Sequence, residues 1–396
     1  MNIQQSADVN RKLEIEAGLA SFIGEFIALR HDIHAHPELA FKEKRTSTLV
    51  ADYLRQWGYD VTTGIGGRGV VGTLKRGNSS KAIGIRADMD ALPISEATGL
   101  DYASTVSGVM HACGHDGHTS ILLAAARYLA ESGRFSGTLN VIFQPAEEIG
   151  AGARRMIEDG LFDRFPCNAI YGLHNWPGVP AGKFGFVSGP AMASVDRARI
   201  RVNGRGGHGA EPHKSIDPVV VASSIVLALQ TVVARNLDPL DMGVITVASI
   251  HGGDALNVIP EHVDLGITIR SFSQSVREEL RRRIEAVARS QAESFGAVAD
   301  VNYQWGFPAL INAKAETEFA RQLALSTFSN GTVIEAFRPR TASEDFAYML
   351  EQKPGTYFFV GNGDSAGLHS PNYNFNDEIL LPASLFWVRL TEASLI

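Results

Sequence analysis

The sequence has 396 residues, which is long enough for two or three domains. Hydrophobic residues make up 45% of the chain and charged residues 20%, as in ordinary soluble globular proteins. A formal net charge of −7 provides no overall basic field for nucleic acid or for an anionic membrane surface, so we expect neither partner.

Cysteine usage and targeting signals together predict a cytoplasmic protein. Only two cysteines occur, Cys113 and Cys167, which is no disulfide framework and fits a reducing compartment. The N-terminal residues lack a basic segment followed by an apolar core, so we expect no secretory signal. The longest apolar stretch, Val219–Ala234, is too short and too interrupted by polar residues to predict a membrane span.

Four short apolar runs predict the buried strands of an α/β sheet. They are Ala82–Ala87, Gly137–Phe143, Asn168–Leu173 and Thr356–Gly361. Helical patterns lie between the first three, notably over Thr119–Ala130. Strands that alternate with helices predict a mixed, mostly parallel sheet covered by helices on both faces.

The segment from about residue 183 to 297 has a different pattern, which predicts a separate domain. Its order is strand, helix, strand, strand, helix, strand, which is that of a ferredoxin-like α+β unit. The predicted elements are Val195–Val202, Asp217–Arg235, Met242–Ile250, His262–Arg270, Val276–Phe295 and Ala297–Trp305. We therefore predict a main domain in two parts, 1–183 and 298–396, with a ferredoxin-like domain inserted at 184–297.

Side chains able to bind metals follow each of the four predicted buried strands, where open α/β sheets bind their ligands. The stretch HACGHDGH, His111–His118, adds three histidines, a cysteine and an aspartate. The candidate ligands are Cys113, His115, Glu148, His174 and His369. Five ligands exceed the four of a closed structural zinc site, so the pattern predicts two metal ions.

Each candidate ligand also has a simpler interpretation. A lone histidine is more often a hydrogen-bonded core or surface residue than a ligand, and a pair of glutamates is usually solvated. Cys113 alone is typical of a small buried hydrophobe, or it is a thiol nucleophile with neighbouring histidines as its base. The coincidence of all five after apolar strands favours the metal site.

A series of motifs in family order gives the chain a specific resemblance from about Leu29 to Phe375. The motifs are RHDIHAHPEL, GIRADMDALP, HACGHDGHT, QPAEE, GLHNWP, GGHGAEPH, NVIP and GLHSP. The sequence resembles the M20 metallopeptidase family, and within it the amidohydrolase branch of hippurate, N-acyl-amino-acid and auxin-conjugate hydrolases. The resemblance implies a di-metal α/β catalytic domain with an inserted lid or dimerisation domain, which agrees with the organisation predicted above.

The resemblance also implies roles for individual residues of the catalytic domain. The five candidate ligands match ligand positions of the family, and Glu147 matches its general base. Asp90 is expected to contact the ligand residues without binding the metal itself, while the role of Asp88 stays open. His111 and His118 fall outside the ligand set; we expect His118 to precede the helix at Thr119 as a supporting or capping group.

Three residues of the inserted domain match family positions that complete the site. His208 matches a histidine that reaches the active site across a dimer interface, so the resemblance implies a homodimer or homotetramer formed through the lid. Asn257 and Arg270 match positions that hold a substrate carboxylate, as a guanidinium does in a bidentate pair. The alternatives are a loop histidine between turn-forming glycines and a strand-end arginine in a surface ion pair.

The expected function is metal-dependent hydrolysis of the amide bond of N-acyl-L-amino acids such as hippurate. Cysteine and histidine ligands favour zinc, nickel or cobalt, and the carboxylate admits manganese. Two alternatives stay open: a dipeptidase or carboxypeptidase of the same fold, and a catalytically silent regulatory protein that still binds metal.

Overall fold

The computed structural model describes residues 3–396, and the chain divides into two compact units. Unit 1 runs up to Gly189 and continues over Ile311–Arg338 and Tyr348–Ile396. Unit 2 comprises Pro190–Leu310 and Pro339–Ala347. Each unit has a hydrophobic core of its own, as expected for separate domains.

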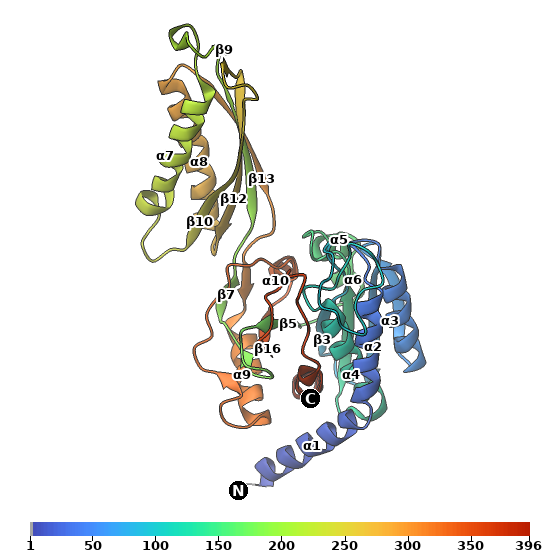
Figure 1. Cartoon of the computed structure of the whole chain (residues 1–396). Helices are drawn as coiled ribbons and strands as arrows, with labels where there is room; N and C mark the ends of the chain where they lie inside the picture. Colours follow the sequence, from blue (N-terminus) through green and yellow to red (C-terminus); the bar gives the residue numbers. More distant parts are fainter. Residues whose placement is uncertain (1–2) are drawn as a thin grey trace. The chain divides into compact units, whose positions relative to one another are not determined.

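Unit 1 is built on an eight-stranded mixed sheet with the order β1-β2-β4-β3-β5-β16-β6-β15. Its strands are β1 (Asp60–Ile65), β2 (Gly69–Arg76), β3 (Ala82–Asp88), β4 (Gly137–Gln144), β5 (Ala169–Pro177), β6 (Phe184–Gly185), β15 (Val333–Ile334) and β16 (Gly355–Gly363). The strands β4, β3, β5 and β16 pair in parallel with one another, so their carboxyl ends meet at one edge. Figure 1 shows β3, β5 and β16 at the centre of this unit.

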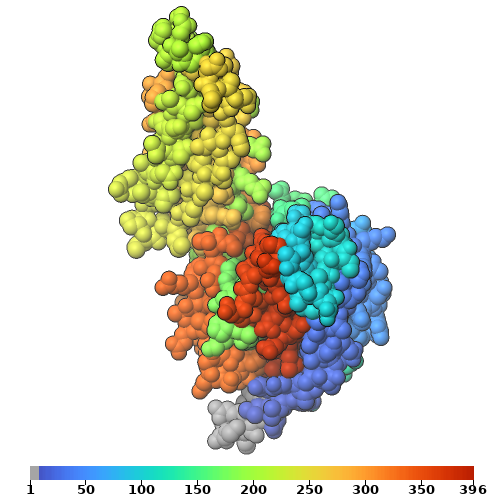
Figure 2. All heavy atoms as spheres, viewed as in Figure 1, coloured from blue at the N-terminus to red at the C-terminus, as the bar shows by residue number. Residues whose placement is uncertain are grey.

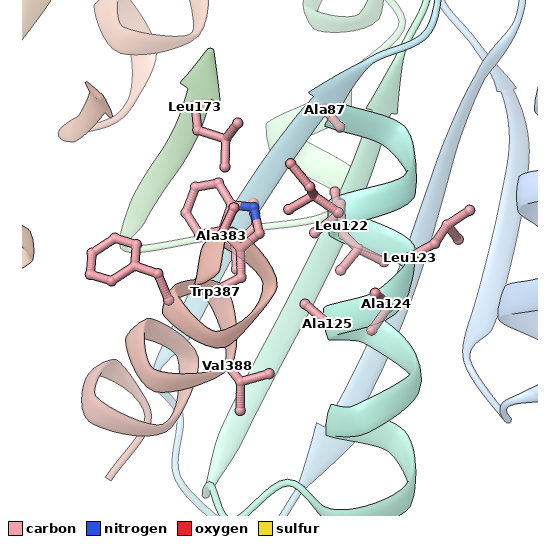
Figure 3. Packing of buried hydrophobic residues seen from close by; sticks show 14 of the residues in the cluster. Ala87, Leu122, Leu123, Ala124, Ala125, Leu173, Ala383, Trp387 and Val388 are labelled. Carbon is pink, nitrogen blue, oxygen red and sulfur yellow. The ribbon is translucent and has the colours of Figure 1, made fainter. Parts of the chain in front are cut away.

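The helices of unit 1 cover this sheet. They are α1 (Ile3–Ala20), α2 (Ile23–Ala35), α3 (Lys44–Gln56), α4 (His115–Ser132), α5 (Gly152–Glu158), α6 (Leu161–Arg164), α9 (Lys314–Thr327), α10 (Ala347–Gln352) and α11 (Leu380–Ser394), with a 3₁₀ turn at Asp377–Ile379. Leu122 and Ala125 lie on the side of α4 that faces Trp387 of α11 (Figure 3). These residues are fully buried or nearly so, so the two helices share one core over the sheet.

The four apolar runs predicted as buried strands are confirmed as β3, β4, β5 and β16. All but the first residue of β3 and all but the second residue of β4 are buried. Strands covered on both faces need continuous apolar runs, which is why the sequence revealed them. The α/β class and the mixed sheet are confirmed with them.

Unit 2 contains a four-stranded antiparallel sheet with the order β10-β12-β8-β13. Its elements are β7 (Gly189–Met192), β8 (Asp196–Asn203), β9 (Gly207–His208), a 3₁₀ turn (Pro212–Lys214), α7 (Pro218–Asn236), β10 (Gly243–His251), β11 (Val258–Ile259), β12 (His262–Ser271), α8 (Gln274–Ser294), β13 (Val298–Trp305) and the bordering β14 (Leu310–Asn312). The predicted ferredoxin-like order is confirmed. Helices α7 and α8 lie on one face of the sheet (Figure 1), and β8 alternates buried and exposed residues accordingly.

Helix α7 is longer than the apolar stretch that predicted it. Among residues 3–396 it is the one helix long and apolar enough to cross a membrane by length and composition, so the expectation that it is too short was wrong. Its buried residues, such as Val221, Ile225 and Leu229, belong to the core of unit 2. Val220 and Leu227 are exposed, so α7 packs on unit 2 through one face only.

Candidate metal centre

The carboxyl ends of the parallel strands and the start of α4 bring the predicted ligands together. His115 is the first residue of α4, and His174 lies near the end of β5. The turn into α4 is made by Gly114, whose φ is 93°; a Cβ atom there would lie 2.2 Å from Oδ1 of Asn175. Only glycine fits this turn, and it places Cys113 and His115 side by side.

The five predicted ligands form two groups that share one thiol. Cys113, His115 and His174 form the first group, and Cys113, Glu148 and His369 form the second. Within each group the donor atoms lie within 4.8 Å of one another. The structure therefore brings together all five residues that the sequence predicted.

The separations between donor atoms fit ligands that share an ion. Cys113 Sγ lies 3.4 Å from His174 Nε2, and His369 Nε2 lies 3.4 Å from Glu148 Oε2. Two ligands at zinc distances from one tetrahedral ion are about 3.3–3.7 Å apart. His115 Nε2 is 3.9 Å from Glu148 Oε1, slightly beyond that range.

Hydrogen bonds behind the ligands prepare their free atoms to bind a cation. Nδ1 of His115 donates to the carbonyl of Asp90 at 2.9 Å, and Nδ1 of His174 donates to the carbonyl of Asn175 at 2.6 Å. Because a carbonyl only accepts, each Nδ1 carries a proton, which leaves Nε2 as the ring atom that can bind a metal. His115 Nε2 and Glu148 Oε1 are buried without a hydrogen-bond partner, so these residues fit a metal.

Negative charge dominates this part of the protein. Burial lowers the pKa of His115, but Asp88 and the hydrogen bond to Asp90 outweigh it and raise that pKa to about 10. Burial raises the pKa of Glu148 to about 8, although His115 opposes the rise. The buried site is therefore short of positive charge, which divalent cations would supply in place of protons.

Asp88 and His118, whose roles the sequence left uncertain, hydrogen-bond to each other beside the ligands. Asp88 accepts from Arg86 Nη1 at 2.7 Å and from His118 Nδ1 at 2.6 Å. The expectation that His118 precedes the helix was wrong, because α4 begins at His115 and His118 lies in its first turn. The prediction missed Arg86; its signal was a charge inside an apolar strand, which must be paired when buried.

His111 keeps no obvious chemical role in the site. Its ring is buried, and neither ring nitrogen has a hydrogen-bond partner. Burial lowers the pKa of His111 to about 4, so the ring is neutral. Among the described residues, His111 belongs to none of the groups whose donor atoms lie within 4.8 Å of one another.

The loop that carries His369 is fixed on the surface of unit 1. His369 has a φ of 62°, and its backbone N–H donates to the carbonyl of Ala112, the residue before Cys113. Further along, the carbonyl of Pro371 accepts from Ala97 N at 2.8 Å. Figure 2 shows the corresponding segments, cyan and red, in contact.

The three residues predicted in the inserted domain do not come together within unit 2. His208 in β9 pairs opposite Val258 in β11, next to Asn257, whereas Arg270 is near the far end of β12. Eight residues separate Arg270 from His262 at the near end, or about 27 Å of strand. One small substrate cannot touch both ends of this sheet.

His208 and Arg270 are each held by a hydrogen bond within unit 2. Nδ1 of His208 accepts from Ala210 N at 3.1 Å, so the ring proton lies on the exposed Nε2. Arg270 is partly buried and donates to Ser343 Oγ, and among the described residues it forms no ion pair. The alternative of a surface ion pair for Arg270 is therefore wrong.

The fold and the site together define an α/β protein with a metal centre of the kind that hydrolases use, at the carboxyl ends of parallel strands. The model of peptidase family M20/M25/M40 matches residues 84–393, and the chain belongs to this family. The predicted resemblance is thereby confirmed, and with it the class of metal-dependent hydrolases.

Named relatives and a solved structure agree with this assignment. The chain is 43% identical to a hippurate hydrolase of Campylobacter jejuni, over 93% of this chain and 96% of that protein. It is 40% identical to an N-acetyl-L-cysteine deacetylase of Bacillus subtilis, over 93% and 88%. The crystal structure of Bacillus subtilis YxeP, described as a dinuclear metal-binding peptidase of the M20 family, matches with a TM-score of 0.83 at 32% identity and covers 95% of this chain and 99% of that one.

Proposed function

We propose that the protein hydrolyses the amide bond of N-acyl-L-amino acids, releasing a carboxylic acid and a free amino acid. One observation carries the proposal: five metal-capable side chains from separate segments converge, with Glu147 beside the ligand Glu148. The names of the two relatives, a hippurate hydrolase and an N-acetyl-L-cysteine deacetylase, support this substrate class.

The five converging side chains would hold two divalent ions, and Cys113 is the residue that the two groups of donor atoms have in common. When bound, such ions supply a water of lowered pKa and polarise the scissile carbonyl. Thiolate and imidazole ligands favour zinc, nickel or cobalt, and the glutamate also admits manganese.

Glu147 is the proposed general base. Its Oε2 lies 3.9 Å from His115 Nε2, at the edge of the ligand cluster, and the residue is largely buried. In the proposed reaction Glu147 takes the proton of the attacking water and delivers it to the leaving amine nitrogen. Its neighbour Glu148 is the metal ligand in this proposal, so one of the two adjacent carboxylates binds metal and the other transfers the proton.

The separation within unit 2 supports a site completed by a second copy of the chain. Arg270 of one copy would bind the substrate carboxylate together with Asn257 of another copy, in which the neighbouring His208 would approach the acyl carbonyl. We therefore propose a homodimer or homotetramer in which unit 2 acts as lid and dimerisation domain. The cytoplasm is the proposed compartment, because two cysteines are too few for a disulfide framework.

The test is hydrolysis of hippurate and a panel of N-acetyl amino acids, with free dipeptides as the competing class. Activity should disappear with a chelator and return when zinc, manganese, cobalt or nickel is added singly. Glu147→Gln should keep the metal content and lose at least a hundredfold in kcat. Metal-dependent activity on dipeptides alone would replace the amidohydrolase with a peptidase, and unchanged behaviour of Glu147→Gln would favour a silent metal-binding protein.

The thiol-nucleophile alternative for Cys113 is tested by its own variant. As a ligand, Cys113→Ser should lose bound metal together with activity; as a nucleophile it would lose activity at unchanged metal content. Cys167 provides the matched control, because burial raises the pKa of its thiol to about 11 and it lies outside the ligand cluster. Cys167→Ser should leave both measurements unchanged.

A further inference from the structure

Glu43 is a buried carboxyl group that none of the steps above uses. It has no exposed surface and stands immediately before α3. An acidic residue there usually accepts from the free N–H groups of the helix, but Glu43 makes no such bond. Glu38 does this instead, accepting from Arg45 N at 2.9 Å and Thr46 N at 2.8 Å.

The side chain of Glu43 reaches the turn that carries the proposed general base. Its Oε1 accepts from the N–H of Ala146 at 2.9 Å, across 103 residues of sequence. Ala146 is fully buried, directly precedes Glu147 and has a φ of 55°. A left-handed conformation costs a non-glycine residue about 1–2 kcal/mol, so neighbouring contacts must hold it.

The next two amides of the turn are held in the same way. Asp90 Oδ1 accepts from Glu147 N and Asp90 Oδ2 from Glu148 N, both at 3.0 Å. Three successive N–H groups therefore donate to two buried carboxyl groups. Asp90 fixes the ligand side of the turn, and Glu43 fixes the peptide bond that enters Glu147.

We propose that Glu43 is a positioning residue, whose hydrogen bond to Ala146 N holds the left-handed turn that aims the carboxylate of Glu147. The proposal rests on the proposed function, in which Glu147 moves the proton. Without an acceptor at this point, Ala146 would relax from its positive φ and rotate the peptide bond before Glu147. A general base must stay within hydrogen-bond reach of its proton, and a displacement of about 1 Å can cost about a hundredfold in rate.

Two conservative variants separate positioning from charge and from simple folding. Glu43→Gln keeps an acceptor oxygen at the same distance, whereas Glu43→Asp keeps the carboxyl but withdraws it by one methylene. Glu38→Asp is the matched control, because it shortens the neighbouring glutamate that caps α3 and has no hydrogen bond to the turn. The readouts are kcat, KM, metal content and hydrogen exchange of the segment 145–152 in the metal-loaded protein.

We expect Glu43→Asp to lower kcat tenfold or more with KM within threefold and metal content unchanged, and to speed exchange at Ala146. Glu43→Gln should stay within threefold of wild type, and Glu38→Asp should keep wild-type kcat. The proposal is overturned if Glu43→Gln is as impaired as Glu43→Asp, if metal is lost in parallel with activity, or if exchange at Ala146 is unchanged. A wild type inactive on every N-acyl amino acid would instead refute the proposed function, and hydrogen exchange would still decide whether Glu43 holds the turn.

Discussion

A buried ion pair of unit 2 offers a quantitative test of what stabilises that domain. Arg277 of α8 donates from Nε to Asp196 Oδ2 at 2.8 Å, and from Nη2 to Asp196 Oδ1 at 2.6 Å and to the carbonyl of Gly306 at 2.9 Å. Its guanidinium also lies 4.8 Å from the ring centroid of Trp305. Arg277→Met keeps most of the aliphatic volume and removes the charge together with these three hydrogen bonds.

The expected loss follows from what remains around Asp196. The carboxylate is 1% exposed, so it stays buried without its counterion. Removing one partner of a buried pair costs about 3–5 kcal/mol. Tyr303 OH at 3.0 Å and Gly306 N at 2.8 Å still donate to Asp196. Because these donors keep part of its stabilisation, we expect a loss of about 3 kcal/mol, at the low end of the range. For a domain of this size that lowers the melting temperature by about 10 °C.

The measurement is thermal unfolding of the full chain, with metal content followed in parallel. Arg201→Met is the matched control, because Arg201 forms an equally bidentate pair with Asp264 at 2.8 Å on the same sheet, but in solvent. We expect no measurable shift for that variant, since solvent screens exposed pairs. Metal content should stay at the wild-type level in both, because every proposed ligand lies in unit 1. Equal melting temperatures for Arg277→Met and Arg201→Met would refute the argument from burial.

Three further predictions concern unit 1. Gly152→Ala should abolish most activity, because a Cβ there would lie 1.6 Å from the carbonyl oxygen of Pro145, whereas Gly24→Ala has open space and should be neutral or stabilising in thermal unfolding. Burial raises the pKa of Glu43 from 4.5 to about 7, so its share of stability is complete below pH 4.5 and lost as the pH rises through 7. Glu43→Gln does not titrate, so its free energy of unfolding relative to wild type should increase from pH 5 to pH 8; a constant difference would contradict this. Trp387→Ala should cost about 3–5 kcal/mol in chemical denaturation, because its ring is 1% exposed in the core, and a loss below about 1 kcal/mol would contradict that packing.

The sequence predicted the ligand cluster because its geometry follows from strand ends. Parallel strands buried on both faces appear as uninterrupted apolar runs, and the residue after each run must lie at the shared carboxyl edge. His174 and Glu148 are far apart in sequence, yet both follow such runs, so their proximity was predictable from topology alone. The alternating pattern of β8 revealed the inserted unit by the same reasoning.

The start of α4 was predicted four residues late, because a pattern of apolar residues cannot indicate a helical turn whose buried residues are polar. The apolar pattern begins at Thr119, but the helix begins at His115. Asp116 and His118 are buried in the first turn through hydrogen bonds to His34 and Asp88. A helix whose first turn is buried by polar contacts has no amphipathic signal there, so only the contacts themselves locate its beginning.

Glu43 had still less chance of being recognised, since it lies in the charged run FKEKRT, a composition typical of solvated surface. The partner of its side chain is the amide of Ala146, 103 residues away, in a left-handed turn after the strand. Neither partner of this hydrogen bond can be predicted from its neighbours in sequence. Glu43 has an ordinary position at the start of a helix, and alanine is not a residue that predicts positive φ. The chemistry of Glu147 can be inferred from its neighbours in sequence, but the direction in which it points depends on a residue that only the folded chain brings beside it.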